Sequence, residues 1–374
     1  MKRIYLDNAA TTAMDPVVLD AMMPYLTEQF GNPSSIYFYG RKSRLAIENA
    51  RKSVAKSLQV TPGEIFFTSG GTESDNMAIY SAVHDLGCRV IITSPIEHHA
   101  VLHAAERQVK DGFAQLKLVK VLPDGHIDLL HLEQLLKETD AKCLVTLMHA
   151  NNEIGNLLDL HAVAGLCLTH GAIFHSDTVQ TVGHYKLDLS HPGIHFATGA
   201  GHKFHGPKGI GILYISKEVQ VRPMIEGGGQ ERNMRAGTEN LYGVVGFAKA
   251  LELAETRMEQ DQQTIQELKS YLIARLRERG DVVFNGDVEG KSLYTVLNAS
   301  FPRTAETEML LMNLDLRGIC VSGGSACSSG ADLGSHVIRA LGSHTDRVPV
   351  RFSFCRHNTK EELDQLLEAL KACC

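Results

Sequence analysis

Residues 199–209 read Gly-Ala-Gly-His-Lys-Phe-His-Gly-Pro-Lys-Gly and place a lysine, Lys203, in a loop of small residues. A lysine at a crowded position flanked by glycines is held close to a ligand rather than extended into solvent. Its ε-amine forms a Schiff base with an aldehyde cofactor when burial or a neighbouring charge lowers its pKa. A basic surface loop is the simpler interpretation, so this stretch needs support from elsewhere in the chain.

That support comes from residues 174–180, which read Phe-His-Ser-Asp-Thr-Val-Gln. The segment is typical of a buried strand that ends in a carboxylate, Asp177, and an amide, Gln180. A carboxylate beside a pyridinium nitrogen and a lysine at the aldehyde carbon are the two protein groups that a pyridoxal phosphate (PLP) site requires. The two segments together predict that the chain binds PLP.

The composition is typical of a globular protein in water. The chain has 374 residues, of which 44% are hydrophobic and 21% charged, enough for a large core and two domains. A net charge of -6 gives no reason to expect binding to nucleic acid or to an anionic membrane. No apolar run approaches the roughly 20 residues that span a bilayer, and the N-terminus lacks the apolar core of a signal peptide. We therefore expect a cytoplasmic protein.

The eight cysteines form no C-x-x-C pair, so no metal site is predicted. Three of them lie in apolar segments and are expected to be small core residues: Cys88, Cys143 and Cys167. Cys327 differs because residues 321–330 surround it with glycines and serines. An exposed thiol on a polar loop is prone to oxidation, so we expect such a thiol to have a function. The terminal pair, Cys373 and Cys374, is expected to form an exposed tail that oxidises readily.

Helical and strand-like segments alternate from about residue 40 to residue 215. Helical periodicity is found in residues 42–58, 72–83, 100–110 and 159–169, and apolar strands are expected at residues 65–68, 89–93, 117–121, 143–148, 172–175 and 211–216. This alternation predicts an α/β fold with a mostly parallel sheet covered by helices on both faces. A helical stretch at residues 241–278 leads to a second domain that ends in an amphipathic helix at residues 359–372.

Candidate functional residues follow these strands, where ligands collect in open α/β sheets. Residues 69–72, Ser-Gly-Gly-Thr, join a strand to a helix and predict a phosphate cradle, although a simple helix cap is the alternative. Of the neighbours His98 and His99, at most one is expected to enter the site. Residues 227–239 combine glycines with two arginines and read either as an anion-binding loop or as a surface loop.

Ten motifs, in order along nearly the whole chain, carry a resemblance to a known family. They are residues 5–12, 31–35, 70–74, 97–98, 151–155, 177–180, 201–203, 227–238, 325–328 and 350–353. In these motifs the chain resembles the cysteine desulfurases of the NifS/IscS type, which are PLP enzymes with the class V aminotransferase fold. The resemblance implies a fold-type I PLP-dependent transferase, with a mostly parallel seven-stranded sheet in a large domain of residues 16–257. A smaller α+β domain would combine residues 1–15 and 258–374.

The resemblance also implies a role for individual residues. Lys203 would hold PLP covalently and act as the base on the substrate Cα. Asp177 would keep the pyridine nitrogen protonated, which strengthens the cofactor as an electron sink. His98 would stack on the cofactor ring and relay protons. Cys327 would attack the substrate sulfur as a thiolate and carry it away as a persulfide, while alanine departs.

Further cofactor contacts are implied for six residues: Gly71, Thr72, Asn152, Gln180, His202 and Thr238. Thr238 would reach the phosphate from the partner subunit of a homodimer. Arg351 would clamp the carboxylate of the substrate L-cysteine as a bidentate pair, and Asn152 would contact the same substrate. Ala200 stands where many relatives have a serine, so one hydrogen bond to the phosphate is expected to be missing.

The implied activity removes sulfur from L-cysteine and gives L-alanine and a Cys327 persulfide, whose sulfur passes to iron–sulfur clusters or to another acceptor. The chain stops at Cys374, without the longer tail that housekeeping members use to dock a scaffold protein, so the acceptor is left open. A selenocysteine lyase or another class V PLP enzyme is the alternative. A transaminase needs no thiol such as Cys327, and a non-catalytic binding protein needs neither Lys203 nor Asp177.

Overall fold

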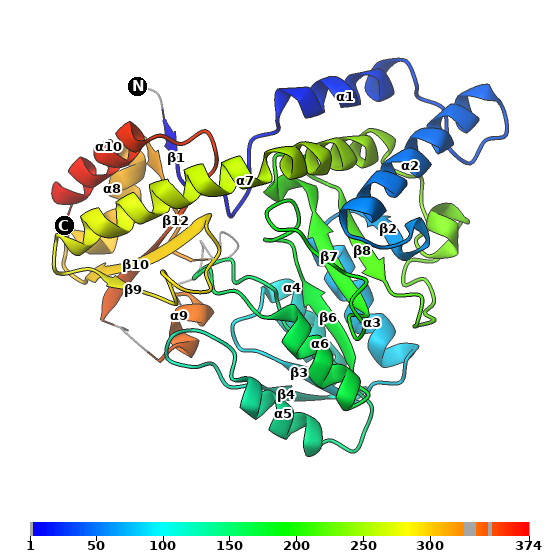
Figure 1. The fold of residues 1–374 in the computed structure, drawn as a ribbon, viewed down its shortest axis with the longest axis horizontal. Coiled ribbons are helices and arrows are strands. Elements are labelled where there is room, and N and C mark those ends of the chain that lie inside the picture. Colours follow the sequence, from blue (N-terminus) through cyan, green and yellow to red (C-terminus); the bar gives the residue numbers. More distant parts are fainter. Residues whose placement is uncertain (1–2, 325–333, 343–345, 374) are drawn as a thin grey trace.

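The structure, a computed structural model, describes residues 3–324, 334–342 and 346–373 of the chain. Its centre is a seven-stranded sheet with the strand order β2-β8-β7-β6-β5-β3-β4 (Figure 1). The strands are β2 (Ile65–Thr68), β3 (Val90–Thr93), β4 (Gln115–Leu118), β5 (Cys143–Thr146), β6 (Ile173–Asp177), β7 (Phe196–Ala200) and β8 (Gly211–Ile215). β8 is antiparallel to both of its neighbours and the other pairs are parallel, which confirms the predicted mostly parallel sheet.

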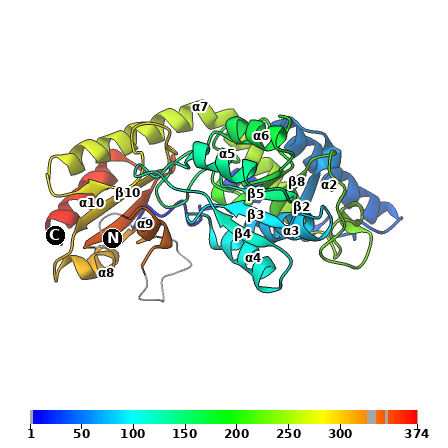
Figure 2. The ribbon, with the colours of Figure 1, turned by 90° about the horizontal axis from the view of Figure 1, so that it is seen from below.

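Helices cover both faces of this sheet because successive strand residues alternate between two cores. Phe66 and Leu144 point into the core under α3 and α4, whereas their neighbours Phe67 and Val145 point into the core on the opposite face. Figure 2 shows α5 and α6 above the sheet and α3 and α4 below it. The helices of this part are α1 (Pro16–Thr27), α2 (Phe38–Ser57), α3 (Gly71–His84), α4 (His99–Lys110), α5 (Leu129–Lys137) and α6 (Leu160–Thr169), with short 3-10 turns η1 (Pro62–Glu64), η2 (Gly201–Lys203) and η3 (Gln230–Asn233).

A long helix, α7 (Leu241–Arg277), connects the sheet to a small domain (Figure 1). Its first residues, such as Phe247, pack in the core of the large sheet, and later ones, such as Leu272, pack in a separate core. Ile4 and Leu6 belong to that second core, so the N-terminal segment lies with the small domain. The boundary at residues 257 and 258 stays a prediction, which this division of α7 between two cores supports.

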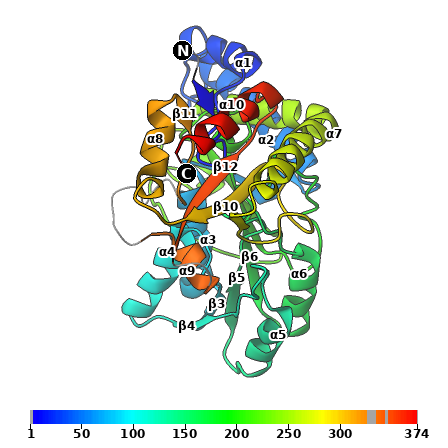
Figure 3. The ribbon, with the colours of Figure 1, turned by 90° about the vertical axis from the view of Figure 1, so that its left-hand side faces the viewer.

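The small domain is a layer of helices on an antiparallel sheet with the order β12-β10-β9, and Figure 3 shows it from its side. The short parallel pair of β1 and β11 joins the N-terminus to it. Its elements are β1 (Ile4–Tyr5), β9 (Val283–Phe284), β10 (Val296–Pro302), η4 (Thr307–Met309), α8 (Leu310–Leu316), β11 (Ile319–Cys320), α9 (His336–Ala340), β12 (Arg347–Ser353) and α10 (Lys360–Lys371). The predicted smaller α+β domain is therefore confirmed.

The structure corrects the expectation of an exposed C-terminal tail. Cys373 is buried, because α10 is amphipathic and its apolar face continues through Leu363, Leu366 and Leu370 to this cysteine. A thiol in this core is shielded from oxidants, so the exposed-tail interpretation was wrong for Cys373. Cys374 lies outside the described residues. Across the described ranges, no helix is long and apolar enough to cross a bilayer.

Candidate active site

One cavity of about 250 Å³ gathers most of the predicted site residues. It opens where the parallel strands end and is closed on one side by Ala9, Ala10 and a residue of β12. Nine of the eleven predicted residues line it: Gly71, Thr72, His98, Asn152, Asp177, Gln180, His202, Lys203 and Arg351. Thr238 is exposed and does not line this cavity, and Cys327 lies outside the described residues.

Lys203 reaches this cavity from the turn η2, which follows directly on β7. Its Nζ atom donates hydrogen bonds to the carbonyl oxygens of Ala9 and Ala10, at 2.6 and 2.9 Å. The turn folds back tightly, since the amide of Gly206 donates to the carbonyl oxygen of Gly201 at 3.0 Å. A Cβ on Gly206 would lie 2.7 Å from that same oxygen, so the flanking glycines are required by a close backbone approach.

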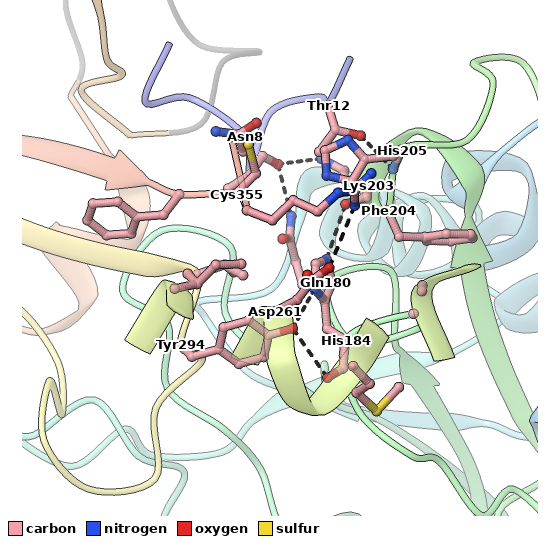
Figure 4. A pocket seen from close by; sticks show the side chains of 18 residues that line it. Asn8, Thr12, Gln180, His184, Lys203, Phe204, His205, Asp261, Tyr294 and Cys355 are labelled. Carbon is pink, nitrogen blue, oxygen red and sulfur yellow. Dashed lines mark hydrogen bonds and ion pairs between the residues drawn. The ribbon is translucent and has the colours of Figure 1, made fainter. Parts of the chain in front are cut away.

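A second, smaller cavity shares Lys203, Gln180 and Ala9 with the first (Figure 4). It lies between the two domains, and Asp261 of α7 and Tyr294 of the small domain contribute to its wall. The hydroxyl of Tyr294 is 2.9 Å from Nδ1 of His184, and Nε2 of that histidine is 3.2 Å from the carbonyl oxygen of Lys203. These contacts fix the backbone of the lysine, while its side chain crosses toward the N-terminal segment.

Asp177 is the last residue of β6 and is buried. Its Oδ1 accepts a hydrogen bond from the amide of Val179 at 2.9 Å. Burial raises the pKa of this carboxyl to about 7, and the nearby Asp75 raises it further, while His175 and Lys203 act in the opposite direction. A positively charged ligand atom beside Asp177 would restore its ionised form, because an opposite charge favours the carboxylate.

Asp75 was not predicted from the sequence, although it also lines the cavity. It lies in the first half of α3, where its place in Glu-Ser-Asp-Asn resembles an ordinary solvated helix start. The structure instead buries it, and Oδ1 has no hydrogen-bond partner, 3.4 Å from Nε2 of His175. Burial raises the pKa of Asp75 to about 7. Two buried carboxyls therefore lie beneath the cavity, and both favour a cationic partner.

The start of α3, which also lines the cavity, is suited to an anion. Helix α3 begins after Gly70, which has φ 153° and offers no side-chain cap to the free N–H groups of the first turn. A Cβ on Gly71 would lie 2.8 Å from Cγ2 of Val179, so glycine lets the helix start approach the cavity wall. Thr72 follows in the same turn, whereas Ala200 adds no hydroxyl group. A buried acid, a lysine and an anion-binding helix start match the ring nitrogen, aldehyde and phosphate of PLP.

His98 is the N-cap residue of α4, and its position follows from that role. Nδ1 accepts a hydrogen bond from the amide of Ala100 at 3.1 Å, which leaves Nε2 as the protonated nitrogen of the neutral ring. Burial lowers the pKa of His98 to about 4, and the charge of Lys203 contributes to this shift. The imidazole is therefore neutral at physiological pH. His99 does not line the cavity, and its ring stacks on His103 with ring centroids 4.7 Å apart.

Gln180 and His202 are held in place by the same N-terminal segment that contacts the lysine. Nε2 of Gln180 donates to the carbonyl oxygen of Ala9 at 3.0 Å. Nδ1 of His202 is 3.2 Å from the hydroxyl of Thr11. Burial, together with the charges of Lys203 and Lys208, lowers the pKa of His202 to about 4, so this ring is also neutral. The N-terminal segment is thus a structural part of the site.

Arg351 lies on β12 and is almost completely buried, with an exposed fraction of 1%. Nη1 donates to the carbonyl oxygen of Asn152 at 2.8 Å, and Nη2 donates to Oδ1 of Asp7 at 2.7 Å. Nε is buried without a partner. Asp7 was not predicted as a site residue, although it belongs to the motif at residues 5–12. A buried guanidinium in the wall of a cavity is suited to a carboxylate ligand.

The loop that carries Thr238 is fastened to the large domain by two ion pairs. Arg51 forms a bidentate pair with Glu231 at 2.8 and 2.9 Å, and both side chains are buried. Arg235 forms a second bidentate pair with Glu73 at 2.8 and 3.1 Å. Since Glu73 belongs to the first turn of α3, this loop is tied to the predicted phosphate cradle while Thr238 itself is turned to solvent.

Comparison with known proteins agrees with this geometry. The family model for the class-V aminotransferases matches residues 4–366. The chain is 43% identical over 371 residues to a protein of Bacillus subtilis strain 168 named putative cysteine desulfurase IscS 1, covering 97% of this chain and 96% of that protein. It is 42% identical over 377 residues to a cysteine desulfurase IscS of Dictyoglomus turgidum, covering 99% of this chain and 94% of that protein.

Solved structures give the same result. A NifS-like protein superposes with a TM-score of 0.90 at 37% identity, covering 99% of this chain and 98% of that one. A NifS-like protein from Rickettsia africae superposes with a TM-score of 0.88 at 31% identity, covering 99% of both chains. With a family match over nearly its whole length and relatives above 40% identity, the chain belongs to the class-V aminotransferase family of PLP-dependent enzymes.

Proposed function

We propose that the protein is a cysteine desulfurase, which removes sulfur from L-cysteine and releases L-alanine. The observation that carries this proposal is the single cavity where Lys203 and the buried Asp177 meet the buried cation Arg351. The first two residues suit the cofactor, and the third suits the carboxylate of an amino acid. Two relatives above 40% identity, each named as a cysteine desulfurase, support this choice among the activities of the family.

The roles of the residues follow from their surroundings. Lys203 would hold the cofactor, Asp177 would bind its ring nitrogen, and the start of α3 at Gly71 and Thr72 would hold its phosphate. When bound, PLP supplies an electron sink that stabilises negative charge at the substrate Cα. Arg351 would orient the substrate through its carboxylate, and the nearby Asn152, whose carbonyl oxygen already accepts from Arg351, would lie beside it.

The amine of Lys203 and the imidazole of His98 can exchange a proton or a hydrogen bond with the substrate in this cavity. The amine of Lys203, once free, takes the proton from the substrate Cα. His98 is neutral and has Nε2–H available, because Nδ1 is occupied by the amide of Ala100. It can therefore donate a hydrogen bond from Nε2 to the substrate or the cofactor.

Cys327 would accept the sulfur. Its thiolate attacks the sulfur of cysteine and the Cβ–S bond breaks. The electron pair of that bond takes a proton at Cβ, and Lys203 returns to Cα the proton that it removed, which completes alanine. The balance is one cysteine and one thiol giving one alanine and one persulfide, with no external oxidant. We extend the proposal to delivery of this sulfur to iron–sulfur cluster assembly in the cytoplasm. A reducing compartment suits the free cysteines among the described residues: Cys88, Cys143, Cys167, Cys320, Cys355 and Cys373.

The purified protein should show a visible absorption band of lysine-bound PLP and convert L-cysteine into equal amounts of L-alanine and sulfide when a reducing thiol is present. L-selenocysteine should be tested in parallel, since a selenocysteine lyase uses the same residue types. Amino-group transfer from L-cysteine to a 2-oxo acid serves as the control reaction. Protein with the visible band that transfers amino groups, or that cleaves only selenocysteine, contradicts the proposed desulfurase activity.

We also propose that the protein is a homodimer. The segment from α1 to α2 exposes large apolar side chains to solvent: Val17, Leu19, Met23, Leu26, Phe30, Ile36, Tyr37, Phe38, Tyr39 and Leu45. Ile36 is 87% exposed and Phe30 is 71% exposed, and both lie in the connection between α1 and α2. Figure 1 shows these two helices projecting from the sheet. An apolar surface of this extent marks an interface. A second copy of the chain fits because Thr238 is presented to solvent on a fastened loop, away from its own cavity.

Sedimentation should give twice the mass of one chain for the wild type. The double change Phe30→Glu and Ile36→Glu should produce monomers with at least about tenfold lower turnover, because charges in a buried apolar interface are strongly unfavourable. Leu130→Glu is the matched control: Leu130 is also exposed, at 81%, but lies on α5 on a different part of the molecule. An active monomer, in either the wild type or the double variant, would count against a site shared between subunits.

A further inference from the structure

The guanidinium of Arg351 is already paired with a carboxylate of the protein. Nη2 donates to Oδ1 of Asp7 at 2.7 Å, and Nη1 donates to the carbonyl oxygen of Asn152 at 2.8 Å. The side chain of Arg351 is 1% exposed and that of Asp7 is 18% exposed, so water screens this pair only weakly. Two of the five N–H groups are occupied, and Nε–H is buried without a partner.

The pairing is built into the fold, because both residues lie on adjacent extended segments. Asp7 forms an isolated parallel bridge with Ser353, two residues after Arg351. The amide of Ser353 donates to the carbonyl oxygen of Leu6 at 2.7 Å, and the hydroxyl of Ser353 accepts from the amide of Ala9 at 2.9 Å. The backbone on both sides of Asp7 is therefore tied to β12, which holds the carboxylate beside the guanidinium.

A substrate carboxylate at Arg351 must share the guanidinium with Asp7. This has two opposing consequences. The hydrogen bond from Nη2 to Asp7 holds the guanidinium of Arg351 in place. This favours binding of the substrate carboxylate, because the entropy cost of ordering the arginine side chain is already met. The negative charge of Asp7 repels a second carboxylate at the same cation, which disfavours binding. The hydrogen bond depends on the oxygen atom of the side chain, and the repulsion depends on its charge, so the two effects are separable by mutation.

We propose that Asp7 is a positioning residue that weakens the hold of Arg351 on amino-acid carboxylates while keeping its side chain aligned. This inference rests on the proposed function, in which Arg351 binds the carboxylate of L-cysteine. The product L-alanine carries the same carboxylate, so Asp7 lowers the affinity for both. A cavity that held alanine tightly would be blocked after each turnover, and the charge of Asp7 promotes release.

Asp7→Asn tests this inference, because the amide keeps the accepting oxygen and removes the charge. Holoenzyme titrated with L-alanine, followed by the change in its visible cofactor band, should show binding about three- to tenfold tighter than that of the wild type. KM for L-cysteine should fall by a similar factor. Asp7→Ala also removes the hydrogen bond, so it should bind alanine more weakly than Asp7→Asn. Asp315→Asn is the matched control, since Asp315 pairs with an arginine, Arg3, at the exposed surface.

The effect of Asp7→Asn on alanine binding must depend on Arg351. In the background Arg351→Gln, which removes the cation that the two carboxylates share, Asp7→Asn should change alanine binding by less than twofold. Alanine binding that is unchanged or weaker in Asp7→Asn, or a gain that persists in full beside Arg351→Gln, overturns the inference. Alanine binding is measured without sulfur transfer, so these outcomes are distinct from failure of the proposed function, which would appear as absent cysteine turnover in the wild type.

Discussion

Replacing Lys203 by alanine should abolish turnover of L-cysteine, with a loss of at least about a thousandfold. This residue is the only lysine that lines the main cavity among the described residues. It lies beside the buried acid Asp177, whose carboxyl it helps to keep ionised. In the absence of Lys203 no amine holds the cofactor and no base faces the substrate Cα. The fold should survive, because the side chain bonds to the carbonyl oxygens of Ala9 and Ala10, while the turn around it is held by backbone contacts.

The measurement combines turnover with chemical mapping. Borohydride reduction of the wild type should fix the cofactor on the peptide that contains Lys203, and Lys203→Ala should lose the label and the visible band on desalting. Lys208→Ala is the matched control, since Lys208 lies five positions later in the same loop and is exposed. A label on Lys208 or Lys217, or near-normal turnover by Lys203→Ala, would contradict the role given to this lysine.

The sequence predicted the functional residues of this site more completely than the strands and helices that hold them. The chemistry is carried by residues such as Asp177, the last residue of β6, and Lys203, in the turn that follows β7. Strands buried on both faces are continuous apolar runs, so their ends are easy to locate. The strand β7 itself was missed, because Phe-Ala-Thr-Gly-Ala contains small residues with weak strand propensity. It is a strand only because β6 and β8 pair with it on both sides.

Helices α1 and α5 were also missed, for different reasons. Helix α1 contains Pro24 and exposes several apolar residues, so its pattern does not show one buried face. It nevertheless has a clear start, with Asp15 as N-cap and Pro16 in the first turn. Helix α5 has a similar cap at Asp128 but only nine residues. Capping signals were the information that could have located both helices.

Contacts between distant parts of the chain were beyond any local pattern. Asp7 and Arg351 are 344 residues apart in sequence, and Lys203 and Ala9 are 194 apart. Asp75 could not be placed under the cavity, because its burial depends on how α3 packs across the carboxyl end of the sheet. The contribution of such residues to the site can be recognised only in the folded structure, where the two domains and the N-terminal segment lie together.

Replacing Cys327 by alanine should lower alanine formation from L-cysteine by at least about a hundredfold while leaving cofactor binding intact. Cys327 lies outside the described residues, so its role is argued from its sequence and from the other cysteines. Burial raises the pKa of the thiols of Cys88, Cys143, Cys167 and Cys355, which disfavours the nucleophilic thiolate. Cys373 is buried in the core of the small domain.

Cys355 provides the sharpest control for this prediction. It lines the smaller cavity that shares Lys203 with the main site, so it is the described cysteine best placed to compete for sulfur (Figure 4). Cys355→Ala should keep near-normal turnover, and mass spectrometry after a pulse of cysteine should find one additional sulfur atom on the peptide of Cys327. Cys327→Ala should still bind L-alanine with unchanged affinity, because Arg351 and Asp177 are intact. If the additional sulfur is found on Cys355 or Cys320, or if Cys327→Ala still forms alanine at the normal rate, sulfur does not leave through Cys327.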